Sequence, residues 1–135
     1  MPTHLFDTNS FLRFILADIP EQANRIEKLL NQAREGKIKV ITLIQVLFEI
    51  EYTLDKMYKF SKSERLDILN NIVNTPYIEL SCGSKREITL GLNIFDESNI
   101  SMVDAYLAAY SITYNAELVS FDAALVKVVK HFSGS

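Results

Sequence analysis

The chain has 135 residues, enough for one domain with a buried core. Its composition, 48% apolar with four glycines and three prolines, excludes a disordered or collagen-like protein. The formal net charge of −3 argues against a uniformly basic nucleic-acid binder, but it allows an enzyme with a local basic track.

Strands and helices are predicted to alternate along the chain. In chain order they are a strand at 3–6, helices at 7–16 and 20–35, a strand at 39–41, helices at 42–54 and 63–75, a strand at 77–80, helices at 84–95 and 102–114, a strand at 117–120 and a helix at 123–131. Capping signals support three of the helix starts, namely Thr42 with Gln45, Ser84 with Glu87, and Ser101.

This alternation predicts the fold class, a three-layer α/β/α sandwich around a central, mainly parallel sheet of four or five strands. Helices outnumber strands, so we expect a helical hairpin on one side of the sheet. The sequence has no internal repeat, low-complexity tract or linker, so residues 1–135 are expected to form a single domain.

The sequence carries no signal for export or membrane insertion. The first ten residues lack the basic start and the long apolar core of a signal peptide, and the most apolar stretch, 40–50, is too short to cross a bilayer. A single cysteine, Cys82, allows no disulfide and makes no zinc-ligand pattern with His4 and His131. We therefore expect a protein of the reducing cytoplasm.

Four acids border or enter apolar segments, where a carboxylate is costly unless it caps a helix, pairs with a cation or holds a metal. Asp7 and Asp122 each follow a predicted strand, whereas Glu49 and Asp104 lie in or near the starts of helices. The carboxyl ends of parallel strands share one edge, which is the usual ligand site of such a sheet. The pattern indicates an acidic pocket for a divalent cation bound through oxygen.

Each aspartate has a simpler alternative role as a helix cap. Asp7 and Asp122 stand at capping positions, and Ser101 with Asp104 forms a capping pattern. From chemistry alone, a metal cluster and scattered caps explain the aspartates equally well.

Glu49 lies in a helix that is apolar nearly all round. Its core stripe comprises Leu43, Val46, Leu47, Ile50 and Leu54, and its second apolar face comprises Ile44, Phe48 and Tyr52. Glu49 and Glu51 lie at opposite edges of the core stripe, so periodicity does not choose between them. A metal, a salt bridge or simple exposure would each explain a carboxylate there.

Four motifs occur in order along the chain: LFDTNSFLR, VLFEIEYTL, SMVDAYLAAY and LVSFDAAL. Together they resemble the PIN-domain ribonucleases, most closely the VapC-type toxins of toxin–antitoxin pairs, from about Leu5 to Leu125. The resemblance implies a PIN-like fold and selects Glu49 over Glu51. The acids that it assigns to catalysis and metal binding are Asp7, Glu49, Asp104 and Asp122, and the polar residues with a supporting role are Thr8, Asn9 and Ser120.

The resemblance also implies an activity and its partners. The activity is metal-dependent hydrolysis of RNA with Mg²⁺ or Mn²⁺, leaving a 5′-phosphate and a 3′-hydroxyl. The partners are a second copy of the chain and a small antitoxin that can place a basic residue in the acidic pocket. The competing interpretation is a non-catalytic interaction module whose acids are only caps. The RNA target is not encoded in any recognisable motif.

Two further features concern the partners. Lys56, Lys59 and Lys62 alternate with aromatic residues after the Glu49 helix and, like Arg13, are candidate RNA contacts. The alternative for the lysines is a solvated helix end that complements the helix dipole. The second apolar face of the Glu49 helix suggests a partner surface, unless it is buried beneath residues 66–72.

Overall fold

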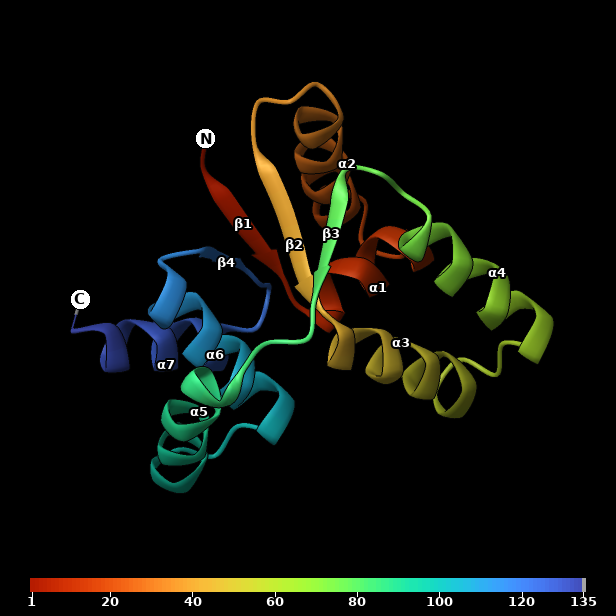
Figure 1. The fold of residues 1–135 in the computed structure, drawn as a ribbon. Coiled ribbons are helices and arrows are strands. Elements are labelled where there is room, and N and C mark those ends of the chain that lie inside the picture. Colours follow the sequence, from red (N-terminus) through yellow and green to blue (C-terminus); the bar gives the residue numbers. More distant parts are fainter. Residues whose placement is uncertain (135) are drawn as a thin grey trace.

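The computed structural model of the chain describes residues 1–134. Within them, four strands and seven helices follow one another (Figure 1). In chain order they are β1 (Thr3–Phe6), α1 (Thr8–Leu16), α2 (Pro20–Arg34), β2 (Lys39–Leu43), α3 (Ile44–Lys56), α4 (Lys62–Val73), β3 (Ile78–Ser81), α5 (Lys85–Glu97), α6 (Met102–Tyr114), β4 (Glu117–Val119) and α7 (Ala123–Ser133).

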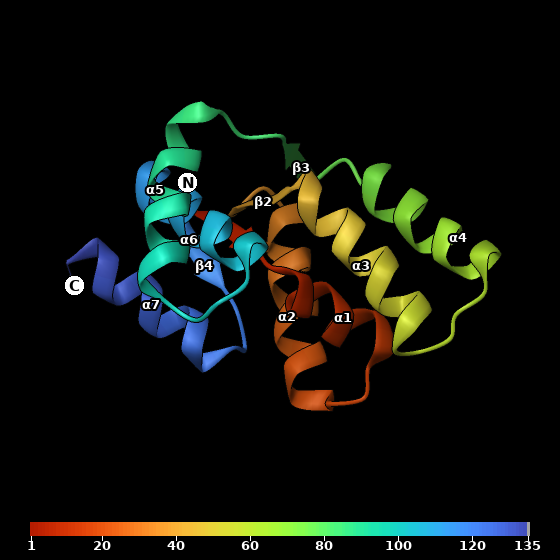
Figure 2. The same ribbon diagram turned by 90° about the horizontal axis from the view of Figure 1, so that it is seen from below.

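The four strands form one parallel sheet in the order β3-β2-β1-β4. The chain steps from β1 to β2 to β3 in one direction and then returns across the sheet to place β4 beside β1. Because such crossovers are right-handed, the change of direction puts the later helices on the opposite face. Figure 2 shows α1 to α4 on one face and α5 to α7 on the other. The predicted three-layer sandwich with a parallel sheet is confirmed.

Both faces of the central strands are covered, which explains their nearly continuous apolar sequence. Leu5, Phe6, Val40 and Leu43 are at most 1% exposed. A second cluster joins α5, α6 and α7 through small residues, and its buried members are Ile94, Ala105, Ala108, Ala109 and Leu125. Within residues 1–134, no helix is long and apolar enough to cross a membrane.

The predicted Thr42–Gln45 capping box is wrong. Thr42 is the fourth residue of β2, and its hydroxyl donates to the Phe6 carbonyl oxygen at 2.8 Å, so it links two strands. The residue that precedes the first turn of α3 is Leu43, which has no capping side chain. Residue 42 therefore extends the strand, and the helix begins two residues later than predicted.

The fourth helix begins before Ser63, where the sequence placed it. Ser61 caps α4 by accepting from the Glu64 amide at 3.1 Å, and the Glu64 carboxylate accepts from the Ser61 amide at 2.8 Å. This reciprocal capping box satisfies two amides that the helix leaves unpaired.

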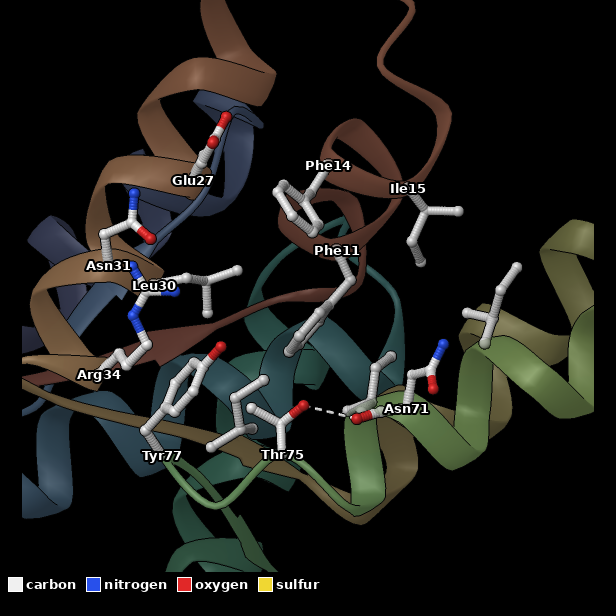
Figure 3. Close-up of a pocket in the computed structure, with 13 residues that line it drawn as sticks. Phe11, Phe14, Ile15, Glu27, Leu30, Asn31, Arg34, Asn71, Thr75 and Tyr77 are labelled. Carbon is white, nitrogen blue, oxygen red and sulfur yellow. Dashed lines mark hydrogen bonds between the residues drawn. The ribbon is translucent and has the colours of Figure 1, made fainter.

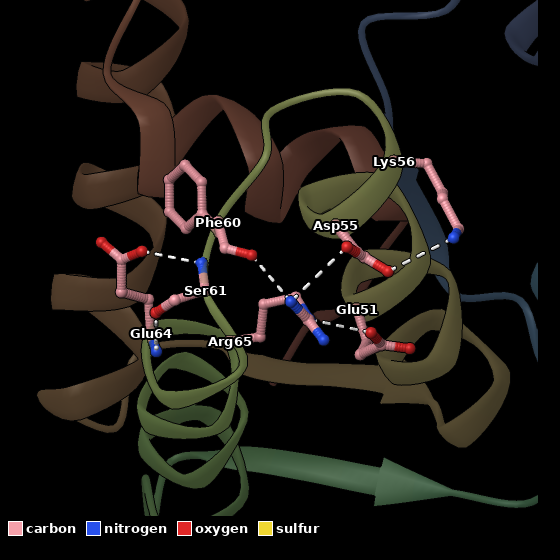
Figure 4. Close-up of polar contacts among 7 residues, drawn as sticks. All are labelled: Glu51, Asp55, Lys56, Phe60, Ser61, Glu64 and Arg65. Atoms are coloured by element: carbon pink, nitrogen blue, oxygen red, sulfur yellow. Dashed lines mark hydrogen bonds and ion pairs between the residues drawn. The ribbon is translucent and has the colours of Figure 1, made fainter.

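The predicted helical hairpin is formed by α3 and α4. Its two helices are joined by Arg65, whose Nε lies 2.9 Å from Glu51 Oε2 and whose Nη1 donates to the Phe60 carbonyl oxygen at 2.7 Å (Figure 4). Asp55 completes the cluster at 3.6 Å from the same guanidinium. The hairpin does not bury the second apolar face of α3, because Ile44, Phe48 and Tyr52 are 39%, 68% and 62% exposed.

Glu87, at the start of α5, is a fully buried carboxylate. It accepts hydrogen bonds from the Ser84 amide at 2.5 Å, from the Ser84 hydroxyl and from Tyr114, and Tyr106 lies 3.4 Å away. Burial raises its pKa, but the hydrogen bonds from Tyr114 and Ser84 together outweigh burial and hold the pKa below the usual value of 4.5. The network ties the β3–α5 loop to α6.

Candidate active site

The candidate site lies where the sheet changes winding direction, between β1 and β4. Asp7 directly follows β1 and Asp122 lies three residues after β4, so both stand at the carboxyl edge. This switch point is where open parallel sheets usually bind ligands. The two neighbouring strands therefore bring together acids that are 115 residues apart (122 − 7) in the sequence.

Asp7 is only 2% exposed and caps α1. Its Oδ1 accepts from the Ser10 amide at 2.8 Å and lies 2.8 Å from the Ser10 hydroxyl, which is also 2.7 Å from the Val119 carbonyl oxygen of β4. Burial raises the pKa of Asp7, and the charge of Asp122 adds to this effect, while hydrogen bonds from Ser120 and Ser10 oppose it. Ser10 is a site residue that the motifs did not identify. Its position three residues after a capping aspartate could have predicted its hydrogen bond to Asp7.

Asp122 caps α7 in the same way. Its Oδ1 accepts from the amides of Ala124 at 2.9 Å and Leu125 at 3.3 Å, and its own amide donates to Ser120 Oγ at 3.0 Å. The capping roles inferred for Asp7 and Asp122 are therefore present. The contacts described for both caps use Oδ1, so capping is compatible with a second role for the carboxylate.

Asp104 lies in the first turn of α6, and its amide donates to the capping hydroxyl of Ser101 at 3.1 Å. The pKa of Asp104 is raised from 3.8 to about 6. Burial is the largest cause, and the charges of Glu49, Asp7 and Asp122 add to it. These contributions place the other three predicted acids within electrostatic range of Asp104, although they belong to three different segments.

Glu49 and Glu51 have different partners. The Thr8 hydroxyl donates to Glu49 Oε1, which links the start of α1 to the second turn of α3. Glu51 instead forms the ion pair with Arg65 on the opposite edge of the helix. The structure thus holds Glu49 at the start of α1, next to Asp7, and gives Glu51 a role within the hairpin.

The donor chemistry of the four carboxylates fits a hard divalent cation. All their donor atoms are oxygens, and a cation would relieve the repulsion that helps to raise the pKa of Asp104. Within the described residues, no three His, Cys, Asp or Glu side chains are drawn together into a ready set of metal ligands. The carboxylates are therefore close enough to repel one another, but no three of them are arranged as ligands of one ion.

The remaining supporting residues differ in exposure. Ser120 is 9% exposed and bonded to the Asp122 amide, and Thr8 is 6% exposed and bonded to Glu49. Asn9 is exposed in the first turn of α1.

The candidate RNA contacts surround the α3–α4 loop. Arg13 is already paired, with Asp18 at 3.0 Å and with the Tyr58 hydroxyl at 3.4 Å. Lys56 is exposed and 3.6 Å from Asp55, while Lys59 and Lys62 are exposed. Only Lys56 lies in the last turn of α3, so the helix-dipole alternative fits that lysine alone.

The fold and these acids define an α/β domain with an acidic site at the carboxyl edge of its sheet. The chain belongs to the PIN domain family, whose model matches residues 5–130. PIN domains are generally nucleases that use divalent metal ions.

Two solved structures are similar in fold to this chain. VapBC2 from Rickettsia felis, bound to a DNA fragment from its promoter, has 19% sequence identity and a TM-score of 0.70, with 93% of this chain and 92% of that chain covered. FitAcB from Neisseria gonorrhoeae has 13% identity and a TM-score of 0.63, with 94% and 93% covered. No curated protein matches the sequence.

Proposed function

We propose that this chain is a metal-dependent endoribonuclease, the toxin of a type II toxin–antitoxin system, acting in the cytoplasm as a single PIN-like domain over residues 1–135. The observation that carries the proposal is the pKa of about 6 at Asp104, raised by burial and then by Glu49, Asp7 and Asp122. Perturbed carboxylates that converge at a ligand-binding edge are typical of a functional site.

Some residues are proposed to bind the metal ion, and others orient those ligands. Asp7, Glu49, Asp104 and Asp122 are the proposed ligands for Mg²⁺ or Mn²⁺, either directly or through water. When bound, such an ion lowers the pKa of its water and stabilises charge on the scissile phosphate and the leaving oxygen. Thr8 orients Glu49 through its hydroxyl. The amide and hydroxyl of Ser10 fix the carboxylate of Asp7.

The direct test is incubation of the purified protein with cellular RNA and Mn²⁺ or Mg²⁺, followed by mapping of the cut ends. We expect 5′-phosphates and 3′-hydroxyls. Asp7→Asn is expected to reduce cleavage by a factor on the order of 100 or more, while the fold survives because asparagine is also a good cap. Asp67→Asn, an exposed change on α4, is the matched control. Full activity of Asp7→Asn would remove the assignment.

A small antitoxin is the proposed regulatory partner, and a groove between α1, α2 and α4 is its proposed binding site (Figure 3). The groove has a volume of about 520 Å³ and an apolar lining that includes Phe11, Leu30 and Ile72, with Glu27 and Arg34 also along it. In VapBC2 and FitAcB, a chain similar in fold to this one belongs to a two-component complex. This similarity supports a protein as the occupant of the groove.

Co-expression with the product of a neighbouring small gene tests this partner. Phe14→Asp, at a groove residue that is 40% exposed, is expected to prevent co-purification while RNA cleavage persists. Unchanged co-purification would exclude the groove as the binding site. The antitoxin is further proposed to place a basic side chain among the four acids.

A second copy of the chain is the other proposed partner. The face of α3 formed by Ile44, Phe48 and Tyr52 is apolar and exposed, which is typical of a protein interface. A second exposed apolar stripe lies on α5 and comprises Ile88, Leu92 and Phe95. Light scattering is expected to detect a dimer, and Phe48→Asp is expected to convert it to a monomer. A wild-type monomer at high concentration would exclude the dimer.

The alternative function is a non-catalytic PIN-like interaction module, and the observed caps formed by Asp7 and Asp122 favour it. The two functions differ in their response to metal. Under the nuclease proposal, Mn²⁺ raises the melting temperature of the wild-type protein, and Asp104→Asn removes most of that increase. A melting temperature independent of Mn²⁺ would favour the interaction module.

A further inference from the structure

A second feature of the carboxyl edge is a cation–π pair, Arg25 and Phe121. Arg25 lies in the second turn of α2 and is exposed, and its guanidinium carbon is 5.4 Å from the centre of the Phe121 ring. Phe121 is half-buried in the loop between β4 and α7, directly between Ser120 and Asp122. Figure 2 shows α2 beside this loop. The contact therefore holds a cation next to the candidate site.

Arg25 differs from Arg13 and Arg65, two other arginines of this face, in its partners. Arg13 is paired with Asp18, and Arg65 is paired with Glu51 and Asp55. In the part of the chain that the structure describes, no carboxylate forms an ion pair with Arg25, and its recorded contact is with an aromatic ring. Its positive charge is thus not neutralised by the protein.

A cation–π contact does not use the N–H donors of a guanidinium, and none of those of Arg25 has a hydrogen-bond acceptor within the described residues. These donors match two phosphate oxygens at once, a geometry that lysine lacks. The ring also restricts the side chain before binding, which lowers the entropic cost of holding a ligand. An acidic site in a protein of net charge −3 repels a polyanion, so a fixed and unpaired cation at its border has a clear electrostatic use.

We propose that Arg25, held against Phe121, binds a backbone phosphate of the RNA beside the acidic site. This inference rests on the proposed nuclease function and adds a substrate contact from α2 to the candidate contacts around the α3–α4 loop. Phe121 acts as a positioning residue for Arg25, because its place next to Asp122 sets how far the bound phosphate lies from the acids.

The simpler alternative is that the arginine stem only covers an apolar ring. The two roles predict different measurements. A covering role affects thermal stability alone, whereas a phosphate contact affects RNA affinity and its salt dependence.

The test measures binding of a labelled single-stranded RNA to the full-length Asp7→Asn protein at several salt concentrations. Adding Arg25→Gln is expected to weaken binding about tenfold at low salt, as expected for loss of a charge-assisted hydrogen bond. The slope of log affinity against log salt is expected to fall by about 0.7. Arg25→Lys is expected to keep the slope and recover only part of the affinity.

Arg86→Gln is the matched control, because Arg86 also forms a cation–π pair, with Tyr114, and its guanidinium carbon lies 5.9 Å from the ring centre. Tyr114 is ten residues beyond Asp104 on α6, about 15 Å along the helix. Arg86→Gln is expected to leave RNA affinity and slope unchanged. Phe121→Leu is expected to weaken RNA binding at a temperature at which the variant is still fully folded.

The outcomes separate this inference from the proposed function. If Arg25→Gln and Arg86→Gln both bind RNA like the parent, the Arg25 contact is refuted, while cleavage by the wild-type protein still supports a nuclease. If the Asp7→Asn parent does not bind RNA and the wild-type protein does not cut it, the contact and the nuclease function fall together. Reduced affinity and slope in Arg25→Gln alone confirm the contact.

Discussion

Asp104→Asn is expected to stabilise the metal-free protein at high pH and not at low pH. The pKa of Asp104 is about 6 in the folded protein, raised from 3.8 by burial and then by the charges of Glu49, Asp7 and Asp122. The folded state therefore holds this proton more tightly than the unfolded state does. Unfolding free energy falls as pH rises from about 4 to about 6, and the full penalty remains above that range.

The size of the penalty follows from the shift. Two pKa units correspond to about 3 kcal/mol if no screening occurs. Asp104 is only partly buried, so solvent screening reduces the penalty to roughly 1–2 kcal/mol. For a chain of this length, that change in unfolding free energy shifts the melting temperature by about 3–8 °C.

Thermal unfolding with a metal chelator at pH 8 and pH 4 measures the effect. We expect Asp104→Asn to melt higher than the wild-type protein at pH 8 and at the same temperature at pH 4. Asp67→Asn removes an exposed charge and is expected to change little at either pH. Equal gains at both pH values, or no gain at pH 8, would refute the raised pKa of Asp104.

Four other changes test the fold and the substrate track. Gly83→Ala is expected to lower the unfolding free energy by about 2–5 kcal/mol in denaturant titrations, because φ is +73° and a Cβ would lie 1.7 Å from the Tyr106 hydroxyl oxygen. Gly36→Ala, with φ +78° and open space, is expected to cost only about 1–2 kcal/mol. Glu87→Ala removes the hydrogen-bond acceptor of the buried Tyr106 hydroxyl and is expected to cost about 1–3 kcal/mol at pH 7, with the difference from wild type shrinking as pH falls below 4.5. Lys59→Glu is expected to weaken RNA binding and its salt dependence, and unchanged binding would exclude this lysine.

Much of the fold is predictable from local signals. The four strands follow from short apolar runs, and the caps at Ser84 and Ser101 mark real helix starts. Local signals fail where a distant partner competes for the same group. The hydroxyl of Thr42 satisfies a capping pattern in the sequence, but the carbonyl of Phe6 on the adjacent strand accepts its hydrogen bond. At α4, two serines compete, and only Ser61 has Glu64 at the capping-box spacing.

The sequence selects the candidate acids through their motifs, but it does not show how they are arranged. Periodicity could not separate Glu49 from Glu51, because their difference lies in partners from other segments, Thr8 on α1 and Arg65 on α4. The cation–π contact of Arg25 with Phe121 also joins residues that share no sequence pattern. Such contacts depend on how helices pack across the sheet, which spacing along one helix does not encode.

The order in which the sheet is completed bears on when the protein can act. The last strand, β4, pairs with the first strand, β1, and Asp122 follows β4. A chain growing from its N-terminus contains Asp7 and Glu49 long before residues 117–122 are made. Under the proposed function, the acidic site is incomplete until the last part of the domain has been translated and has folded. A nuclease with this topology therefore cannot cut the messenger RNA or the ribosome that is producing it before residues 117–122 have been translated and folded.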